Sequence, residues 1–268
     1  MKKAILSIFV LICAASAWAF HTDTIKVATQ HLETAMDVTV IVPDKAAQGQ
    51  RFPTVYLLNG YGGDHRAWGN VRNNLGELAD NYGMVMVMPD GRDSWYWDSP
   101  VDPKMQMETF FMVDLVPYID KHYPTIDDAS KRAITGLSMG GHGALWLAVR
   151  HPNVFGLAGS TSGGVNILPF PGRWRMAERL GAYEGNEQVW REHTVASLIP
   201  LFKNANLKII FDCGADDFFA EVNDRFHHEL LNAKVPHEYI SRPGNHSGAY
   251  WKNSILYHLL FFSEAFNK

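Results

Sequence analysis

Short, largely apolar runs alternate with longer amphipathic stretches along the chain. Five of these runs, of four to seven residues each, lie at 53–58, 84–88, 133–136, 157–161 and 207–213. Runs of this length and character are typical of strands that are buried on both faces of a sheet.

Two earlier segments show a different pattern. Residues 24–29 and 36–42 alternate apolar and polar side chains at period two. This alternation predicts a hairpin at the edge of the sheet with one face in water.

Helical periodicity appears between the strands, at 71–82, 108–122, 141–150, 220–233 and 249–266. The third of these stretches ends at His151-Pro152, because the residue before a proline disfavours helical backbone. Strands that alternate with helices predict a mostly parallel sheet with helices on both faces. Ligands of such sheets bind beyond the carboxyl ends of the strands, so we expect the chemistry in the loops that follow strands.

The segment 163–198 interrupts this alternation. It contains Pro169, Pro171, several glycines, Trp174 and Trp190. One interpretation is a cap-like insertion over the strand ends, and the other is a solvated surface loop. The two tryptophans slightly favour the cap, because indole rings need a place to bury.

The first nineteen residues have the form of a signal peptide. Lys2 and Lys3 precede an apolar run at 4–15, and Ala17-Trp18-Ala19 has the small residues of a cleavage site. We therefore expect 20–268 to be a single exported domain, periplasmic or secreted from a bacterium. No stretch approaches the roughly 18 apolar residues of a membrane span, so no stable membrane anchor is expected.

Charge and cysteine content narrow the class of protein further. The chain has 268 residues, with 24 basic groups against 28 acidic ones and an isoelectric point near 6.3. Lys and Arg are scattered, which argues against nucleic-acid binding. Cleavage after Ala19 would leave Cys213 as the only cysteine. The exported domain would then have no internal disulfide, and its stability would come from its core.

The strongest chemical motif is Gly136-Leu137-Ser138-Met139-Gly140, a G-x-S-x-G sequence between a predicted strand and a predicted helix. This context is that of a nucleophile elbow, a sharp turn that holds a serine hydroxyl clear of the backbone. The Met139 N–H, at the start of the helix, is then a donor to an oxyanion. The alternative is a glycine-rich turn with a structural role only.

A serine nucleophile needs a base and an acid that orients the base, and after this elbow they follow in the order Ser, Asp or Glu, His. Asp216 and Asp217 both follow the strand at 207–213. The spacing from Gly214 favours Asp217 as the acid, with Asp216 as the alternative. His246 lies in a loop between a short strand and the last helix, which makes it the predicted base.

The other histidines after the acid fit less well. Two lie in a predicted helix without the spacing of a zinc site, one begins a strand and one lies in the last helix: His227, His228, His237 and His258.

A second oxyanion donor should come from the loop after an early strand. The strand at 53–58 is followed by Asn59-Gly60-Tyr61-Gly62-Gly63, where glycines let a backbone N–H point into the site. Tyr61 is the predicted donor.

Five motifs in this order resemble one family. They are LLNGYGG (57–63) followed by Trp68, SWYWDSP (94–100), GLSMGGHGA (136–144), GADD (214–217) and GNHSGAYW (244–251). Together they are similar to the esterase D-like α/β-hydrolases, which include S-formylglutathione hydrolases, tributyrin esterases, feruloyl and acetylxylan esterases of carbohydrate esterase family 1, and mycolyltransferases of the antigen 85 type.

The resemblance implies an α/β-hydrolase fold and the roles already assigned to Ser138, Asp217, His246, Tyr61 and Met139. It also implies that Trp95, Tyr96 and Trp251 line the substrate cleft. Asn59 departs from the family, in which many members carry His or Asp before the glycine; this puts the side-chain bonding of the loop in question.

The expected function is that of a serine carboxylesterase working through an acyl-enzyme, with no cofactor and no metal. The expected partner is a small or oligosaccharide ester, with feruloyl or acetyl groups on plant polysaccharide as the first choice. Short-chain aliphatic esters, an S-formylglutathione thioester and acyl transfer to an alcohol are alternatives. A non-catalytic binding protein on a hydrolase fold is the alternative from another class.

Overall fold

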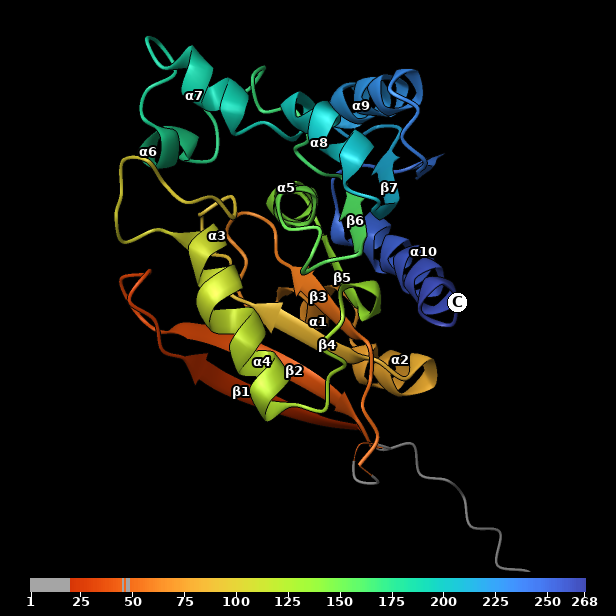
Figure 1. Ribbon diagram of the computed structural model, residues 1–268. Coiled ribbons are helices and arrows are strands. Elements are labelled where there is room, and N and C mark those ends of the chain that lie inside the picture. The colour runs from red at the N-terminus through yellow and green to blue at the C-terminus, as the bar shows by residue number, and fades with distance from the viewer. Residues whose placement is uncertain (1–19, 45, 47–48) are drawn as a thin grey trace, which may run out of the picture.

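The computed structural model describes residues 20–268 apart from 45, 47 and 48. The predicted signal peptide lies outside the described residues. Eight strands form one sheet in the order β1-β2-β4-β3-β5-β6-β7-β8 (Figure 1). β1 pairs antiparallel with β2, and β2 with β4, while every other pair is parallel. The prediction of a mostly parallel sheet with an antiparallel edge is confirmed.

The strands follow the apolar pattern closely. Their bounds are β1 Phe20–Val27, β2 Met36–Pro43, β3 Thr54–Leu58, β4 Val85–Pro89, β5 Arg132–Gly136, β6 Leu157–Thr161, β7 Lys208–Gly214 and β8 Glu238–Arg242. β3 to β6 are buried at every position, because helices cover both of their faces. β1 keeps mostly exposed side chains, as expected of an edge strand. The predicted water-facing side of the hairpin is wrong for β2, which lies between β1 and β4 and is buried at every position except Asp37.

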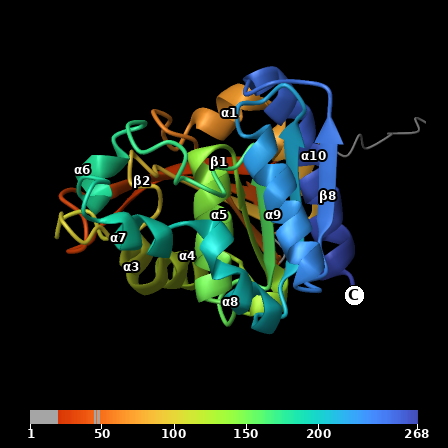
Figure 2. The ribbon, with the colours of Figure 1, turned by 90° about the horizontal axis from the view of Figure 1, so that it is seen from above.

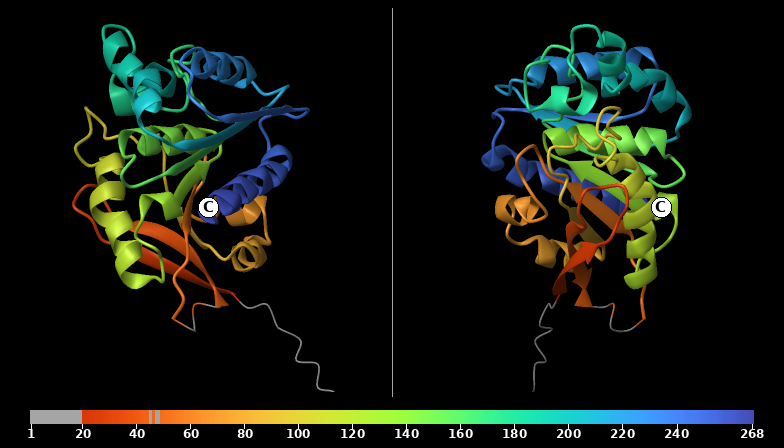
Figure 3. Two further views of the ribbon diagram at one scale, coloured as in Figure 1. Left: turned by 45° about the vertical axis from the view of Figure 1, so that its right-hand side comes forward. Right: turned by 90° about the vertical axis from the view of Figure 1, so that its left-hand side faces the viewer.

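Two sets of helices cover the sheet (Figures 1 and 3). On one face lie α1 Ala67–Val71, α2 Leu75–Tyr82 and α10 Gly248–Phe266. On the other lie α3 Met107–Thr109, the π-helical η2 Phe110–Leu115, α4 Val116–His122, α5 Met139–Arg150, α8 Ile199–Asn204 and α9 Ala220–Asn232. A short 3₁₀ turn, η3 Ala129–Lys131, leads into β5.

Two helix predictions need correction. The stretch predicted as one helix at 71–82 is divided between α1 and α2, with Arg72 in an extended conformation. Asn73 and Asn74 follow it, and asparagine side chains favour turns over helix interiors. The stretch at 108–122 contains the π turn of η2, which ends two residues before Pro117, a residue without an N–H for the helical ladder.

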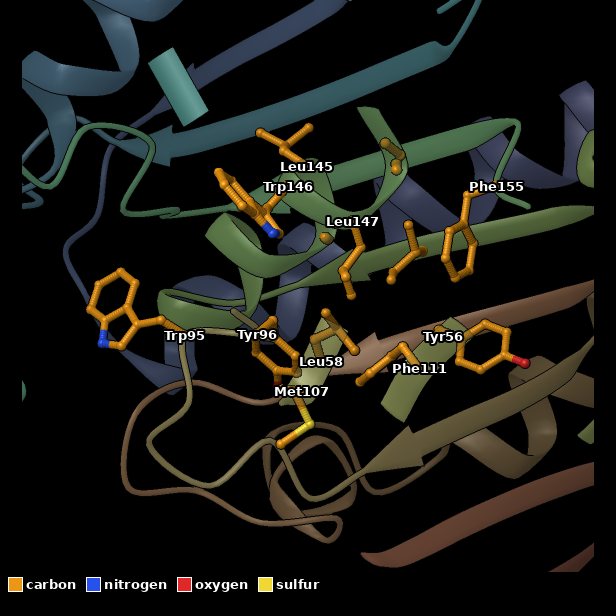
Figure 4. Close-up of a cluster of buried hydrophobic side chains, with 14 of the residues drawn as sticks. Tyr56, Leu58, Trp95, Tyr96, Met107, Phe111, Leu145, Trp146, Leu147 and Phe155 are labelled. Carbon is orange, nitrogen blue, oxygen red and sulfur yellow. The ribbon is translucent and has the colours of Figure 1, made fainter. Parts of the chain in front are cut away.

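Helix α5 lies deep in the molecule. Its residues from Met139 to Val149 are all buried. It packs beside Tyr56, Phe111 and Phe155 in the core drawn in Figure 4, where the Tyr56 and Phe155 rings meet edge to face at 5.6 Å. A serine at the start of this helix is therefore held by a rigid support.

The insertion at 163–198 forms α6 Met176–Leu180, α7 Glu187–Glu192 and the 3₁₀ turn η4 Val195–Leu198. Seen from above, α6 and α7 lie on the opposite side of α5 from α9 and α10 (Figure 2). Trp190 is fully buried and Trp174 half-buried. The buried Arg179 pairs with Asp93 and Asp102, each at 3.0 Å. The segment therefore contains buried and ion-paired residues and is not solvated along its whole length.

Candidate active site

Ser138 lies at the sharp turn between β5 and α5, with φ 57° and ψ −118°. This left-handed φ is strained for a serine and turns its side chain away from the strand. Two glycines make the turn possible. A Cβ on Gly136 would stand 2.3 Å from the backbone of Gly140, and a Cβ on Gly140 would stand 2.3 Å from the Leu58 carbonyl oxygen.

The predicted acid and base lie beside Ser138. The Nε2 atom of His246 is 2.9 Å from the Ser138 Oγ, and the Nδ1 atom is 2.9 Å from an oxygen of Asp217. Because a carboxylate only accepts, Nδ1 carries the proton and Nε2 is free to accept from the serine hydroxyl. The Asp217 side chain is fully buried and also accepts the Phe219 N–H at 2.9 Å. Asp216 is exposed, so Asp217 is the carboxylate that contacts the histidine.

The loop that carries Tyr61 approaches the elbow closely. A Cβ on Gly60 would stand 2.6 Å from the Leu137 side chain and 3.2 Å from the Ser138 Cβ. Within the described chain, no hydrogen bond uses the backbone N–H of Tyr61 or that of Met139. Two donors are therefore available close to the serine, as an oxyanion hole requires.

The Asn59 side chain, which stands where many family members carry His or Asp, makes two hydrogen bonds within the site. Its Oδ1 accepts the Gly91 N–H at 2.8 Å, and its Nδ2 donates to the Gly60 carbonyl at 3.0 Å. The Tyr96 hydroxyl donates to the Asn59 carbonyl at 3.0 Å. These bonds fix the turn in front of Tyr61.

The expectation that Trp95 and Tyr96 line the substrate cleft needs correction. Both side chains belong to the core drawn in Figure 4: Tyr96 is fully buried and Trp95 is 1% exposed. Tyr96 bonds to Asn59, and Trp95 stacks on Trp97 with ring centres 5.5 Å apart. Both rings are therefore part of the hydrophobic core that supports the site. Trp251, on α10, is half-buried and meets the His246 ring edge-on at 5.0 Å.

A buried histidine in the first turns of α5 connects three segments. His142 accepts the Trp97 indole N–H at Nε2, 2.8 Å away, and lies 3.0 Å from the Gly164 carbonyl through Nδ1. Burial lowers the pKa of His142 to about 3, so the ring is neutral and Nδ1 donates. The nucleophile helix is thereby tied to the loop around Trp97 and to the start of the insertion.

A second Asp–His pair lies beneath the site. His258 Nε2 is 2.8 Å from Asp212, and its Nδ1 is 2.7 Å from the Thr135 hydroxyl; all three residues are fully buried. Asp212 also accepts from the Thr161 hydroxyl at 3.0 Å and from Ser254. The apolar pattern of the last helix predicts no special role for His258, and this pair is not evident from the sequence.

A metal site and a membrane-spanning helix are both absent from the part of the chain that the structure describes. There, no three His, Cys, Asp or Glu side chains are grouped to hold a metal ion. None of the described helices has the length and apolar character of a membrane span.

A cavity of about 620 Å³, with Leu207, Val235 and Phe261 in its lining, lies at the amino ends of β7 and β8. Ser138 instead follows β5 at its carboxyl end, where ligands of parallel sheets bind.

Comparison with known proteins agrees with this geometry. A family model described as "Putative esterase" matches residues 29–262. The chain belongs to this esterase family. Its match to the family confirms the resemblance inferred from the five motifs.

Individual relatives of this esterase-family chain differ in how far they match. An esterase of Mycobacterium tuberculosis is 27% identical over 236 residues, which cover 78% of this chain and 52% of the relative. The chain thus spans about half the length of that relative. An acetyl esterase of Caldicellulosiruptor saccharolyticus is 26% identical, over 80% of this chain and 85% of the relative.

Solved structures confirm the α/β-hydrolase fold. A ferulic acid esterase superposes with a TM-score of 0.78 at 26% identity, covering 93% of this chain and 99% of its own. An S-formylglutathione hydrolase from Staphylococcus aureus gives 0.80 at 19% identity, covering 91% and 99%. Because its sequence identity is only 19%, the second match supports the fold alone.

Sequence reasoning missed several residues of this esterase-family site. His142 appears in the motif at 136–144, but nothing in a linear pattern shows that its ring faces Trp97. Phe218 directly follows Asp217 in the acid loop and lies 4.2 Å from the His246 ring. Its place after a strand end was the signal that could have identified it.

Proposed function

We propose that this chain hydrolyses carboxylic esters through an acyl-enzyme formed on Ser138. The observation that carries the proposal is the unbroken set of contacts from Asp217 through His246 to the Ser138 hydroxyl, with two free backbone N–H groups beside it. Neither a structural turn nor a binding protein needs this combination.

The first half of the reaction forms the acyl-enzyme. His246 Nε2 takes the proton of Ser138 as Oγ bonds to the ester carbonyl carbon, and the carbonyl oxygen becomes an oxyanion held by the Tyr61 and Met139 N–H groups. Asp217 keeps the imidazole in the right tautomer and stabilises its positive charge. The C–O bond to the alcohol then breaks, and His246 gives the proton to the departing alkoxide oxygen.

The second half uses water in the place of the alcohol. His246 accepts a proton from the water as its oxygen attacks the acyl carbon, and the same two N–H groups hold the second oxyanion. The bond to Ser138 Oγ breaks, the serine recovers its proton from His246, and the acid leaves. An alcohol acceptor in the place of water would give acyl transfer through the same steps.

The proposed substrates are acetyl or feruloyl esters on plant polysaccharide. Support comes from the similarity to an acetyl esterase and, at 26% identity, to a ferulic acid esterase. A thioester such as S-formylglutathione is the second candidate, because an S-formylglutathione hydrolase of Mus musculus is 24% identical over 76% of this chain. The signal-peptide pattern before Phe20 favours export and hence the polysaccharide esters.

Replacement of the nucleophile tests the mechanism. Ser138→Ala should lower kcat on p-nitrophenyl acetate by about 10⁶, because the residue that forms the covalent bond is gone. Ser197→Ala is the matched control, since this serine is exposed in the insertion. Circular dichroism should show both variants folded. A folded Ser138→Ala protein that keeps more than about a thousandth of the activity would rule the mechanism out.

A panel of esters tests the substrate class. The values of kcat/KM for matched acetyl, butyryl and feruloyl esters should favour acetyl or feruloyl. A consistent preference for butyryl would contradict the polysaccharide assignment and leave the mechanism intact.

A further inference from the structure

Two aromatic rings from separate segments stack beside the catalytic histidine. Phe218, in the acid loop, is 52% exposed, and its ring centre is 4.2 Å from that of His246. Trp174, in the insertion, stacks on Phe218 with ring centres 5.8 Å apart and planes at 24°. We call Phe218 and Trp174 the aromatic shelf.

The backbone that carries Trp174 is strained. Trp174 and Arg175 both have left-handed φ angles, 48° and 53°, which cost free energy in residues with a Cβ. Arg175 pairs with Asp93 at 2.9 Å, and the buried Arg179 pairs with the same carboxylate at 3.0 Å. Strain that neighbouring ion pairs maintain at an open site is a frequent mark of function.

The position of the shelf shows which part of an ester it meets. The carbonyl oxygen is directed to the Tyr61 and Met139 N–H groups, and the leaving oxygen must reach His246 Nε2 to receive its proton. The alcohol therefore departs past the His246 ring, and the Phe218 ring lies against that same imidazole. The acyl group extends away from this side of the serine.

We propose, on the basis of the esterase mechanism above, that the aromatic shelf binds the alcohol portion of the ester and selects an alcohol with a flat, apolar ring face. Stacked aromatic rings offer a broad apolar surface that complements such a face. A sugar ring, through its axial C–H groups, and an aryl ring share this chemistry, whereas a short linear alcohol lacks it.

Three acetates that differ only in the alcohol test the proposal: an acetylated methyl xylopyranoside, phenyl acetate and ethyl acetate. Phe218→Ala should lower kcat/KM for a ring acetate about 3- to 10-fold more than for ethyl acetate, mainly through KM. Phe218→Leu, which keeps bulk but not the flat ring, should act in the same direction. Leu231→Ala, at an exposed position on α9, is the matched control.

The outcomes separate the alternatives. If Phe218→Ala lowers kcat/KM selectively for the acetylated xylopyranoside, the alcohol that binds the shelf is a sugar. If it does so selectively for phenyl acetate, the alcohol is an aryl alcohol. An equal loss on all three acetates overturns the proposal, because Phe218 would then only position His246. A changed ratio between ethyl ferulate and ethyl acetate also overturns it, since the shelf would then bind the acyl group. If the unaltered protein hydrolyses none of these esters and its Ser138 does not react with a fluorophosphonate, the proposed function itself fails.

Discussion

Two Asp–His–hydroxyl arrays lie against the same sheet of this protein, and one of the two is open to a substrate. In the first, Asp217, His246 and Ser138 are joined by contacts of 2.9 Å each. In the second, Asp212 and His258 are 2.8 Å apart, and His258 is 2.7 Å from the Thr135 hydroxyl. By distance alone the two arrays are equivalent.

Their surroundings make the difference. Thr135 lies within β5, an ordinary extended strand buried at every position, while Ser138 lies three residues later on a strained turn. The His246 side chain is 16% exposed and that of His258 is fully buried. Beside Ser138 lie the backbone N–H groups of Tyr61 and Met139, which no hydrogen bond among the described residues uses. Access and oxyanion donors, in addition to triad distances, therefore define a hydrolase site.

The buried array has a structural task that serves the open one. Asp212, on β7, contacts Thr161 on β6 and both Ser254 and His258 on α10. The Thr161 carbonyl in turn accepts the Ser138 N–H at 3.0 Å. The array therefore holds together the strand ends from which the catalytic loops emerge.

The two arrays should differ most in the loss of kcat that follows replacement of the aspartate, which in the open array is Asp217. Asp217→Asn should lower kcat on p-nitrophenyl acetate by about 10⁴, because an amide can stabilise the wrong tautomer of His246 and cannot stabilise its positive charge. Urea unfolding curves separate this kinetic loss from any loss of folded protein. A loss of less than about tenfold would mean that Asp217 does not orient the base.

Asp212→Asn should act mainly on stability. Removing the charge from a buried pair should lower the free energy of unfolding by about 3 to 5 kcal/mol, measured from urea unfolding curves. The folded fraction should retain far more activity than Asp217→Asn does. If Asp212→Asn instead matched the kinetic loss of Asp217→Asn at full stability, the division of roles would be wrong.

The smallest expected effect is a dependence of stability on pH. Burial alone would raise the pKa of Asp212, but the hydrogen bond and charge of His258 and the Ser254 hydroxyl outweigh it and hold the pKa below its usual 3.8. Because the pKa of Asp212 is lower in the folded protein than in the unfolded chain, its carboxylate stabilises the fold. This contribution is fully present above about pH 4 to 5 and is lost as the pH falls through the folded-state pKa.

The difference in unfolding free energy between the unaltered protein and Asp212→Asn should therefore narrow as the pH falls from about 5 to below about 4. Urea unfolding at a series of pH values measures this difference. A gap that widens as the pH falls would contradict the lowered pKa.

The open array could be predicted from the sequence and the buried one could not. Ser138, Asp217 and His246 each follow a predicted strand, and parallel strands bring their carboxyl ends to one edge. His258 meets Asp212 across 46 residues inside a helix whose apolar pattern looks ordinary. The burial of Trp95 and Tyr96 depends on left-handed φ angles of 54° and 65°, which no apolar period reveals.

Labelling with a fluorophosphonate, followed by mass spectrometry of the peptides, is the sharpest test of the assignment of Ser138 as the nucleophile, because the reagent reacts with an activated hydroxyl. This assignment predicts one adduct per chain, on Ser138, and none on Thr135 or Ser254. A folded protein whose Ser138 remains unlabelled, or one labelled at the buried array, would contradict it.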